Sequence, residues 1–379
     1  MKIFYWSPFF SKIATIQAVI RSAESLIQYE KQKKYDVSIV NAIGEWEEYR
    51  KSIDKKINII NLNNTNLINI IPKNSYIKSR LSYIFIFLFN FFKLKRLIKQ
   101  EQPNYLIIHL ITSLPILLSI FFKKKTKIIL RISGLPKINI LRYFFWKLFS
   151  NNIHIVTCPT KATYDYFKQK KIFSEEKLII LKDPVIDIEK FKNQSKEKIE
   201  NKFLEKKIII GIGRLTKQKN FELLINFFLK IEKDYPEYIL IILGEGENRH
   251  KLEKIIKDFK LQNKIYILGH QNNVYKYLKN SKYFILSSLW EDPGFVLIEA
   301  ALSNSTIISS DCPNGPDEII VNKNFLFKNN NLEDLYNKFQ RIEDNPHDLT
   351  VLNQKILVKK RIKEFTKFWH YKSLNKLLN

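Results

Sequence analysis

Residues 284–299 read Phe-Ile-Leu-Ser-Ser-Leu-Trp-Glu-Asp-Pro-Gly-Phe-Val-Leu-Ile-Glu, and the fold prediction starts from this stretch. An apolar run bounded by serines is typical of a buried β-strand. A turn around Pro293 and Gly294 follows it, and Phe295 opens an apolar helical segment. Parallel α/β sheets bind ligands beyond the carboxyl ends of their strands, and this turn would lie at such an end.

The turn offers hydrogen-bond donors to an anionic ligand. The first N–H groups of a helix have no partner within the helix, and the helix dipole is positive there. Gly294, Phe295 and Val296 can therefore donate to a phosphate. The carboxylates of Glu291 and Glu299 flank this position, and we interpret them as acceptors for sugar hydroxyls on either side of a diphosphate. The stretch thus predicts a nucleotide sugar as the ligand.

A second loop between a predicted strand and a predicted helix carries two cations. Residues 211–220 read Gly-Ile-Gly-Arg-Leu-Thr-Lys-Gln-Lys-Asn. Arg214 provides a planar, bidentate donor and Lys219 a compact charge, so the pair can neutralise a leaving diphosphate. Gly213 lets the backbone approach a ligand closely. Because the chain contains no Asp-X-Asp triplet, we expect no metal ion and no other cofactor.

Short apolar segments alternate with helical segments along the chain. Strands are predicted at residues 2–6, 36–41, 105–110, 127–132, 153–158 and 178–181, and again at 207–211, 238–243, 264–268, 283–287 and 306–310. This alternation predicts an α/β fold of two Rossmann-like, doubly wound domains facing a central cleft. The pattern breaks near residue 185, so the predicted domains are 1–185 and 186–350. Residues 351–379 are expected to form a helix that returns to the first domain.

Composition bounds the class of protein. A chain of 379 residues with 45% hydrophobic residues can bury two cores, which excludes a disordered protein. Its two cysteines, Cys158 and Cys312, lie far apart and show no metal-ligand spacing, which favours a reducing, cytoplasmic location. The apolar run at the start is too short for a secretory signal and is interpreted as the first strand.

The net charge of +27 is unevenly distributed. Residues 73–150 contain 15 lysines and arginines and one acidic residue, Glu101. Segments mixing aromatic, aliphatic and basic residues lie there, at 81–99, 114–127 and 138–149. Their apolar runs are too short to span a bilayer, which needs roughly 20 residues. We interpret them as a surface that contacts the anionic inner face of the cytoplasmic membrane. Ordinary core helices with solvated charged faces are the alternative.

Five motifs in the second half carry a family resemblance. They are Gly-Arg-Leu-X-X-X-Lys-Asn at 213–220, Leu-Gly-Glu-Gly at 243–246, Leu-Gly-His at 268–270, Glu-X7-Glu at 291–299 and Ser-Asp-Cys-Pro-Asn-Gly-Pro-Asp-Glu at 310–318. Over about 207–320 the chain resembles the retaining nucleotide-sugar glycosyltransferases of glycosyltransferase family 4 (group 1). The resemblance implies the two-domain GT-B fold.

The resemblance also implies roles for individual residues. Arg214 and Lys219 would bind the donor diphosphate, with help from the amides of residues 294–296. Glu299 would hold the ribose hydroxyls, Glu291 the donor sugar hydroxyls, and the segment at Leu268 would flank the nucleobase. Transfer of a hexosyl group with retention of configuration, and without a metal, is what the family suggests.

The acceptor side is less defined in the sequence. The resemblance suggests a saccharide or lipid-linked acceptor in bacterial surface polysaccharide synthesis, such as lipopolysaccharide, O-antigen or capsule. His109 and Arg131 end two predicted strands and are candidates for this side, although a histidine at a strand end is more often a satisfied core residue.

Two other classes of protein remain as alternatives. One is a basic nucleic-acid-binding protein, although the chain lacks the usual nucleic-acid-binding signatures. The other is a GT-B enzyme of different chemistry, such as an epimerase or a phosphorylase.

Overall fold

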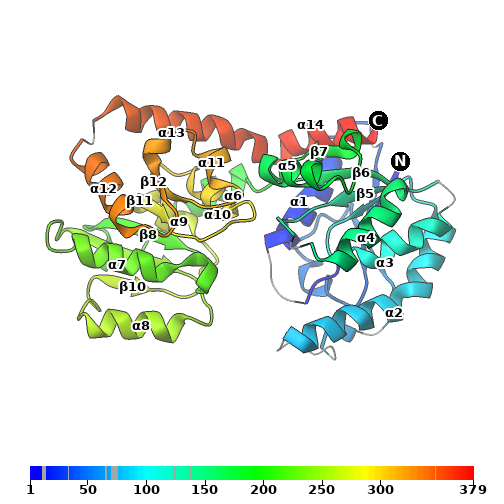
Figure 1. The fold of residues 1–379 in the computed structure, drawn as a ribbon, viewed down its shortest axis with the longest axis horizontal. Helices are drawn as coiled ribbons and strands as arrows, with labels where there is room; N and C mark the ends of the chain where they lie inside the picture. Colours follow the sequence, from blue (N-terminus) through cyan, green and yellow to red (C-terminus); the bar gives the residue numbers. More distant parts are fainter. Residues whose placement is uncertain are drawn as a thin grey trace. The chain divides into compact units, whose positions relative to one another are not determined.

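Two parallel β-sheets, one in each half of the chain, organise the computed structural model (Figure 1). The structure describes residues 1–10, 14–32, 34–64, 66–69, 76–122, 125–136, 138–345 and 347–379. Contacts divide the chain into two compact units, which we call unit 1 (residues 1–185 and 365–379) and unit 2 (residues 186–364).

Within its described residues, unit 1 contains seven strands, all parallel, in the order β3-β2-β1-β4-β5-β6-β7. They are β1 (Lys2–Trp6), β2 (Asp36–Asn41), β3 (Asn58–Asn61), β4 (Tyr105–Ile108), β5 (Lys127–Arg131), β6 (Ile153–Cys158) and β7 (Leu178–Ile180). All four residues of β4 are buried, as expected for a strand covered by helices on both sides of the sheet.

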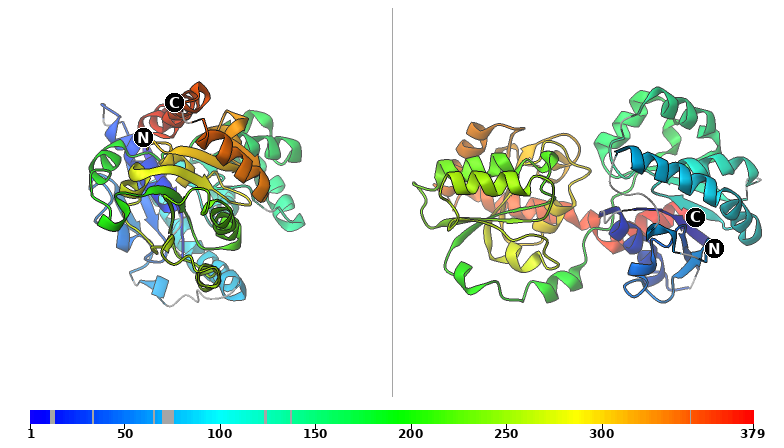
Figure 2. Two further views of the ribbon diagram at one scale, coloured as in Figure 1. Left: turned by 90° about the vertical axis from the view of Figure 1, so that its left-hand side faces the viewer. Right: turned by 90° about the horizontal axis from the view of Figure 1, so that it is seen from below.

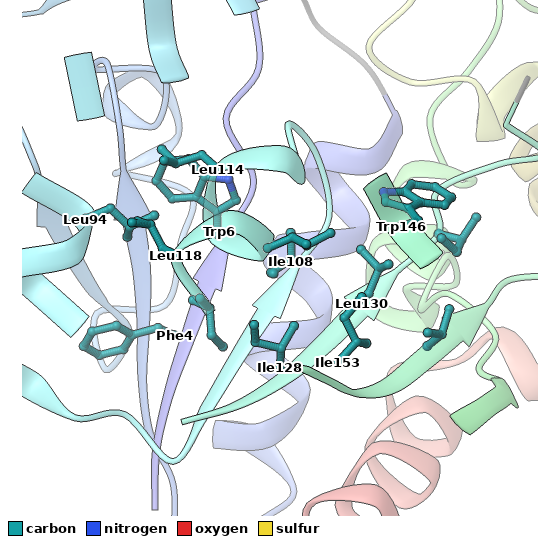
Figure 3. Packing of buried hydrophobic residues seen from close by; sticks show 14 of the residues in the cluster. Phe4, Trp6, Leu94, Ile108, Leu114, Leu118, Ile128, Leu130, Trp146 and Ile153 are labelled. Atoms are coloured by element: carbon teal, nitrogen blue, oxygen red, sulfur yellow. The ribbon is translucent and has the colours of Figure 1, made fainter. Parts of the chain in front are cut away.

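In the part of unit 1 that the structure describes, six α-helices cover the two faces of this sheet. They are α1 (Ala14–Gln28), α2 (Tyr76–Glu101), α3 (Ser113–Leu118), α4 (Ile140–Phe149), α5 (Lys161–Lys170) and α14 (Lys367–Leu378). Side chains from α2, α3, α4 and α5 pack into one hydrophobic cluster against the strands, and Figure 3 shows Leu94, Leu114 and Trp146 in it. Side chains from α1 and α14 pack on the opposite face.

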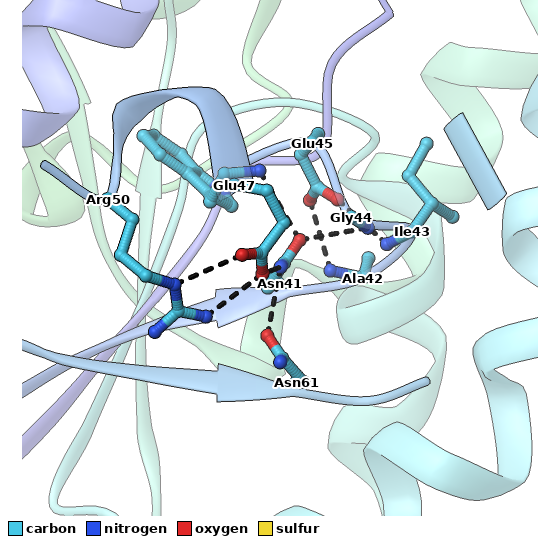
Figure 4. Close-up of polar contacts among 9 residues, drawn as sticks. Asn41, Ala42, Ile43, Gly44, Glu45, Glu47, Arg50 and Asn61 are labelled. Atoms are coloured by element: carbon cyan, nitrogen blue, oxygen red, sulfur yellow. Dashed lines mark hydrogen bonds and ion pairs between the residues drawn. The ribbon is translucent and has the colours of Figure 1, made fainter. Parts of the chain in front are cut away.

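Polar side chains shape the loop after β2 (Figure 4). The carboxylate of Glu45 is buried and accepts the N–H groups of Ala42 at 3.1 Å and Ile43 at 2.7 Å. Asn41 Oδ1 accepts the N–H of Gly44 at 3.0 Å. Despite these hydrogen bonds, removal from water raises the pKa of Glu45 to about 7.

Among the residues that the structure describes, unit 2 repeats the plan with six parallel strands in the order β10-β9-β8-β11-β12-β13. Figure 2 shows the ribbon of each unit from two further sides. They are β8 (Lys207–Ile212), β9 (Tyr238–Leu243), β10 (Ile265–Ile267), β11 (Ser281–Leu286), β12 (Thr306–Asp311) and β13 (Leu326–Lys328). Its helices are α6 (Ile188–Gln194), α7 (Phe221–Ile231), α8 (Arg249–Asp258), α9 (Tyr275–Asn280), α10 (Phe295–Ala300), α11 (Pro316–Ile319), α12 (Leu332–Glu343) and α13 (Leu349–Ile362). The predicted pair of Rossmann-like, doubly wound α/β domains is confirmed.

The expected single returning helix over residues 351–379 needs correction. The chain forms two helices there, separated by a 3₁₀ turn (Lys363–Phe365), and α13 belongs to unit 2. Val351, Val358 and Ile362 are buried, which places the apolar side of α13 against unit 2. Only α14 packs in unit 1, mainly against α1.

No helix in the described part of the chain is long and apolar enough to cross a bilayer.

Candidate functional site

The candidate site of unit 2 lies where the order of its strands reverses. The neighbouring strands β8 and β11 are connected in opposite directions across the sheet, so the loops after them diverge at this position. Rossmann-like sheets bind ligands at such a switch point, beyond the carboxyl ends of the strands. The two loops that the sequence singled out, residues 213–220 and 287–294, are therefore brought together by the sheet order.

An ion pair joins the two loops. Lys219 Nζ lies 2.6 Å from Glu291 Oε1, and only 14% and 4% of the respective side chains are exposed. Ser288 Oγ donates to the same oxygen of Glu291 at 2.6 Å. Two predicted site residues from distant parts of the sequence thus share one buried polar cluster.

Further hydrogen bonds tie the loops together. Ser287 Oγ donates to the backbone oxygen of Lys219 at 2.8 Å. Leu289 N donates to Gln218 O at 2.8 Å, and Gln218 Nε2 donates to Trp290 O at 2.9 Å. Because these contacts use backbone atoms of both loops, they fix the positions from which Lys219 and Glu291 project.

The loop after β12 supports the Glu291 turn from a third strand. Asn314 Nδ2 donates to Glu291 O at 3.1 Å and to Asp292 Oδ1 at 2.8 Å, and Glu291 N donates to Pro313 O at 3.1 Å. The sequence identified the 310–318 motif but no role for Asn314. Asn314 lies 23 residues after Glu291 in the sequence. The contact could therefore be recognised only once β11 and β12 were known to be neighbours in the sheet.

Glycines let the loops approach one another. Gly294 precedes α10 with φ +85°, a conformation that side chains disfavour. A Cβ at Gly315 would lie 2.3 Å from Pro293 O, and one at Gly244 would lie 1.9 Å from Gly213 O. The turn around Pro293 and the loop at Gly213 can therefore adopt these positions only beside glycine.

Helix α10 begins directly after this turn. Its first residues, Phe295 and Val296, are partly buried, and helix geometry leaves their N–H groups without partners inside the helix. Glu299 lies on the same short helix and is also partly buried. Gly294, Phe295, Val296 and Glu299 thus follow Glu291 within one turn-and-helix unit, as the sequence predicted.

Arg214 and Leu268 lie on loops that are each hydrogen-bonded through their backbones to the segment at residues 243–244. Gly213 N donates to Leu243 O at 2.9 Å, and Gly244 N donates to Gly269 O at 2.8 Å. The segment at Leu268 is therefore linked through Gly244 to the loop of Arg214. The Arg214 side chain is exposed to solvent, so its guanidinium is accessible to a ligand.

The two acceptor-side candidates lie in unit 1 and are buried. Arg131 Nε donates to Asp183 Oδ1 at 3.1 Å, and Arg131 Nη1 donates to Ile132 O at 3.0 Å. His109 is 6% exposed. Burial, with smaller contributions from Arg131 and His370, holds the pKa of His109 well below its ordinary value. The Arg131 side chain is thus paired within unit 1, and no observation assigns either residue to the acceptor.

Within the described ranges, no group of three or more histidine, cysteine, aspartate or glutamate side chains is arranged to hold a metal ion.

Comparison with known proteins identifies the relatives of this chain. Residues 192–357 match the family model described as glycosyl transferases group 1. An uncharacterized glycosyltransferase of Methanocaldococcus jannaschii is 35% identical over 273 residues, which cover 66% of this chain and 66% of that protein. A Campylobacter jejuni enzyme, N-acetylgalactosamine-N,N'-diacetylbacillosaminyl-diphospho-undecaprenol 4-alpha-N-acetylgalactosaminyltransferase, is 27% identical over 59% of this chain and 60% of its own length. The match thus spans about two thirds or less of these curated relatives.

A solved structure resembles the whole chain. The structure of Anabaena HepE in complex with UDP matches with a TM-score of 0.75 and 12% identity, covering 100% of this chain and 99% of that protein. At this identity the likeness concerns the fold, and it agrees with the two Rossmann-like units of the GT-B architecture.

Proposed function

We propose that this chain, which belongs to the glycosyl transferases group 1 family, moves a hexosyl group from a nucleotide-diphosphate sugar to a saccharide or lipid-linked acceptor. The buried pairing of Lys219 with Glu291 at the switch point of unit 2 is the observation that carries this proposal. The pair puts a cation and a sugar-hydroxyl acceptor beside each other, next to the start of α10.

The proposal assigns the donor to the residues gathered in unit 2. Arg214, Lys219 and the N–H groups of residues 294–296 would hold the diphosphate. Glu291 would accept hydrogen bonds from the donor sugar, and Glu299 from the ribose. Leu268 would lie along the nucleobase. Arg214 is exposed and Lys219 is partly buried, and both side chains project from the same loop. This arrangement supports a diphosphate-binding role for the two cations.

Catalysis would then be electrostatic. As the bond to the anomeric carbon breaks, negative charge accumulates on the leaving diphosphate, and the fixed positive groups stabilise it. Lys219 has three N–H donors, so it can contact a phosphate oxygen while it still holds Glu291. We propose attack by the acceptor hydroxyl on the face that the diphosphate leaves, with retention and without a protein nucleophile or a metal ion. The hydroxyl proton would pass to the departing phosphate oxygen.

The acceptor side of the proposal concerns surface polysaccharides. The name of the Campylobacter relative specifies a diphospho-undecaprenol acceptor, which is a lipid-linked sugar. By analogy we propose a lipid-linked or saccharide acceptor in bacterial lipopolysaccharide, O-antigen or capsule synthesis. The enzyme would then work at the cytoplasmic face of the membrane, and the basic aromatic segments of unit 1 support that location.

The role of Lys219 is testable by substitution. Lys219→Ala alone would leave Glu291 buried without its cation, which destabilises proteins. Lys219→Ala combined with Glu291→Gln avoids the unpaired charge. We expect both variants to lose a factor of about 10² or more in acceptor-dependent nucleotide release, because a fixed charge at the leaving group is removed.

Lys217→Ala is the matched control, since Lys217 lies exposed in the same loop. It should retain wild-type turnover. Equal turnover in the Lys219 variants and the Lys217 variant, with melting temperatures intact, would contradict the proposal. Nucleotide release that needs no acceptor would favour the alternative GT-B chemistry.

A further inference from the structure

One outer surface of unit 1 is both apolar and basic. Helices α2, α3 and α4 lie in one layer over the same face of the sheet, and their inner side chains share one core (Figure 3). Leu94 on α2, Leu114 on α3 and Trp146 on α4 all point into that core. The opposite sides of these helices therefore face outward together.

The outward side of α2 is apolar at positions where a single packed helix would be polar. From Ser82 onward every fourth residue faces the core, namely Ser82, Ile86, Asn90, Leu94 and Ile98. Leu88 and Phe92 lie on the other side and are 66% and 76% exposed. Leu81 and Ile84 extend the same stripe and are also more than half exposed.

Helix α4 repeats this arrangement. Its exposed side chains are Ile140, Leu141, Phe144 and Leu148, which are 74%, 80%, 64% and 76% exposed. Spacings of one, four and eight residues place them within one stripe of the helix, roughly opposite Trp146. Four large apolar side chains in one stripe exceed what a solvated helix surface normally shows.

The segment between these helices continues the surface. The 3₁₀ helix Ser119–Phe121 exposes Ile120 and Phe121. Lys95 of α2 lies 3.6 Å from the ring of Phe121, so this segment adjoins α2. Asn152 Nδ2 donates to Ser119 Oγ at 2.9 Å, which links it to the end of α4. We call the exposed side chains of α2, Ser119–Phe121 and α4 the basic apolar face.

The charge distribution indicates that the partner of this face is anionic. Unit 1 contains 34 lysines and arginines and 12 aspartates and glutamates, whereas unit 2 contains 30 and 25. Lys93, Arg96 and Lys99 continue the outer side of α2. A cavity of about 810 Å³ between the ends of α4 and α5 is lined by four lysines and two acidic residues: Lys147, Lys168, Lys171, Lys177, Asp165 and Glu175. Cations thus lie beside the apolar stripes at the C-terminal part of α2 and at the C-terminal end of α4.

We propose that the basic apolar face binds the surface of an anionic lipid bilayer, with the apolar side chains of α2 and α4 in the headgroup and acyl boundary and the lysines and arginines at the anionic headgroups. Binding of this face to a bilayer would bring the enzyme to a lipid-linked acceptor, and that part of the proposal rests on the proposed function.

Other occupants fit the face less well. A second copy of the chain would bring two strongly positive surfaces together, which opposes self-association. Nucleic acid would match the charge but would leave the exposed leucines and phenylalanines without apolar partners. An anionic bilayer provides both kinds of contact.

A flotation experiment tests the face directly. The triple variant Leu141→Ser, Phe144→Ser and Leu148→Ser removes most of the α4 stripe without touching the core. The matched control is Leu349→Ser, Leu352→Ser and Ile356→Ser on α13, which exposes three apolar side chains to 71%, 56% and 56% in unit 2. Both are compared with wild type on vesicles of phosphatidylcholine with phosphatidylglycerol, and on phosphatidylcholine alone.

Wild type and the α13 variant should float with the anionic vesicles, and the α4 variant should bind them roughly tenfold less or weaker. Binding should fall with salt and be weak on phosphatidylcholine. The proposal is overturned if the α4 variant floats like wild type or if only the α13 variant loses binding. It is also overturned if wild type self-associates through the α4 stripe in sedimentation experiments.

Enzyme activity separates this inference from the proposed function. In vesicle-free buffer the α4 variant should keep the stabilisation that UDP or another nucleoside diphosphate gives to wild type. Lys219→Ala should float normally and yet lack turnover. If wild type does not float but releases nucleotide in the presence of acceptor, only the proposal of a membrane-binding face is wrong. If wild type floats but releases no nucleotide, only the proposed function is wrong.

Discussion

Contacts between the two loops of unit 2 hold Lys219 and Glu291 as a buried pair. Burying two charges costs desolvation energy, which their attraction and the hydrogen bond from Ser288 offset. A pair fixed in this way needs little rearrangement when the leaving group becomes charged, and such preorganisation is how electrostatic catalysis works. Because a buried ion pair adds little net stability, its position here favours a functional role.

Glu45 provides a residue-scale prediction about pH. Its pKa in the folded protein is raised from 4.5 to about 7, so the folded state binds a proton more tightly than the unfolded state. The resulting stability is complete below pH 4.5 and is lost as the pH rises through about 7. The shift corresponds to about 3 kcal/mol. Urea unfolding of wild type and Glu45→Gln across this range should show their stability difference moving against wild type as the pH rises.

The pH dependence of the difference is diagnostic. A change in packing alone would make the free energies of unfolding of the two proteins differ by the same amount at every pH. If the difference between wild type and Glu45→Gln does not depend on pH, Glu45 is ionised in the folded protein throughout and the assignment fails.

At the scale of elements, mostly buried strands inside the two sheets were the easiest to predict. Strands β1, β2, β6 and β9 match their predicted ranges at both ends, because apolar runs bounded by polar residues mark a strand between two helix layers. The edge strands β3 and β13 were not predicted. β3 reads Asn-Ile-Ile-Asn and β13 has three residues, so neither carries a pattern long enough to recognise.

The C-terminal tail shows why element packing escapes sequence patterns. Residues 349–378 are helical nearly throughout, and apolar residues recur along both halves. Nothing in that periodicity says which unit each half contacts. Tertiary partners decide it: the N–H of Asn322 donates to Gln354 Oε1 at 3.3 Å on α13, whereas His370 on α14 contacts unit 1.

His370 gives the prediction at element scale. Its ring joins α14 to the remainder of unit 1, since Nδ1 donates to Lys182 O at 2.8 Å and Nε2 accepts from Ser22 Oγ at 2.8 Å. Burial lowers its pKa from 6.5 to about 4, so the unfolded state binds more protons between these values. Stability is therefore complete above pH 6.5 and falls by about 3 kcal/mol as the pH drops towards 4.

Urea denaturation of wild type and His370→Gln from neutral pH to about pH 4 measures this effect. Glutamine can keep both hydrogen bonds but does not titrate. The variant should therefore lose less stability in acid than wild type. Equal acid sensitivity in the two proteins would show that His370 does not couple α14 to proton binding.

At the scale of the whole molecule, the sequence predicted which residues belong to each loop of the site, but not how the loops lie relative to one another. Each motif of unit 2 predicted its own loop, and the sheet order then placed the loops of Lys219 and Glu291 side by side. Asn314 could not be assigned, because its contacts to the Glu291 turn depend on a neighbouring strand. The acceptor side stayed undefined, since burial of His109 and Arg131 is a property of the folded unit 1.

The two units also differ in charge and in surface character. Unit 2 is nearly balanced in charge and carries the polar cluster with the family motifs, whereas unit 1 carries most of the excess positive charge and the basic apolar face. Donor and bilayer should therefore act on different parts of the chain. Hydrogen exchange measured by mass spectrometry can resolve the two responses in one protein.

We expect UDP, or whichever nucleoside diphosphate binds, to slow exchange in residues 207–220 and 281–318, because a ligand at 100 times its dissociation constant stabilises its site by about 2.7 kcal/mol. Anionic vesicles should instead protect α2 and α4, whose outer sides are exposed to solvent. Lys219→Ala should weaken the first response alone, and the α4 triple variant the second alone. Saturating nucleotide that protects α2 and α4 while residues 207–220 exchange freely would place the donor in unit 1, and the assignment of the switch point in unit 2 would then be wrong.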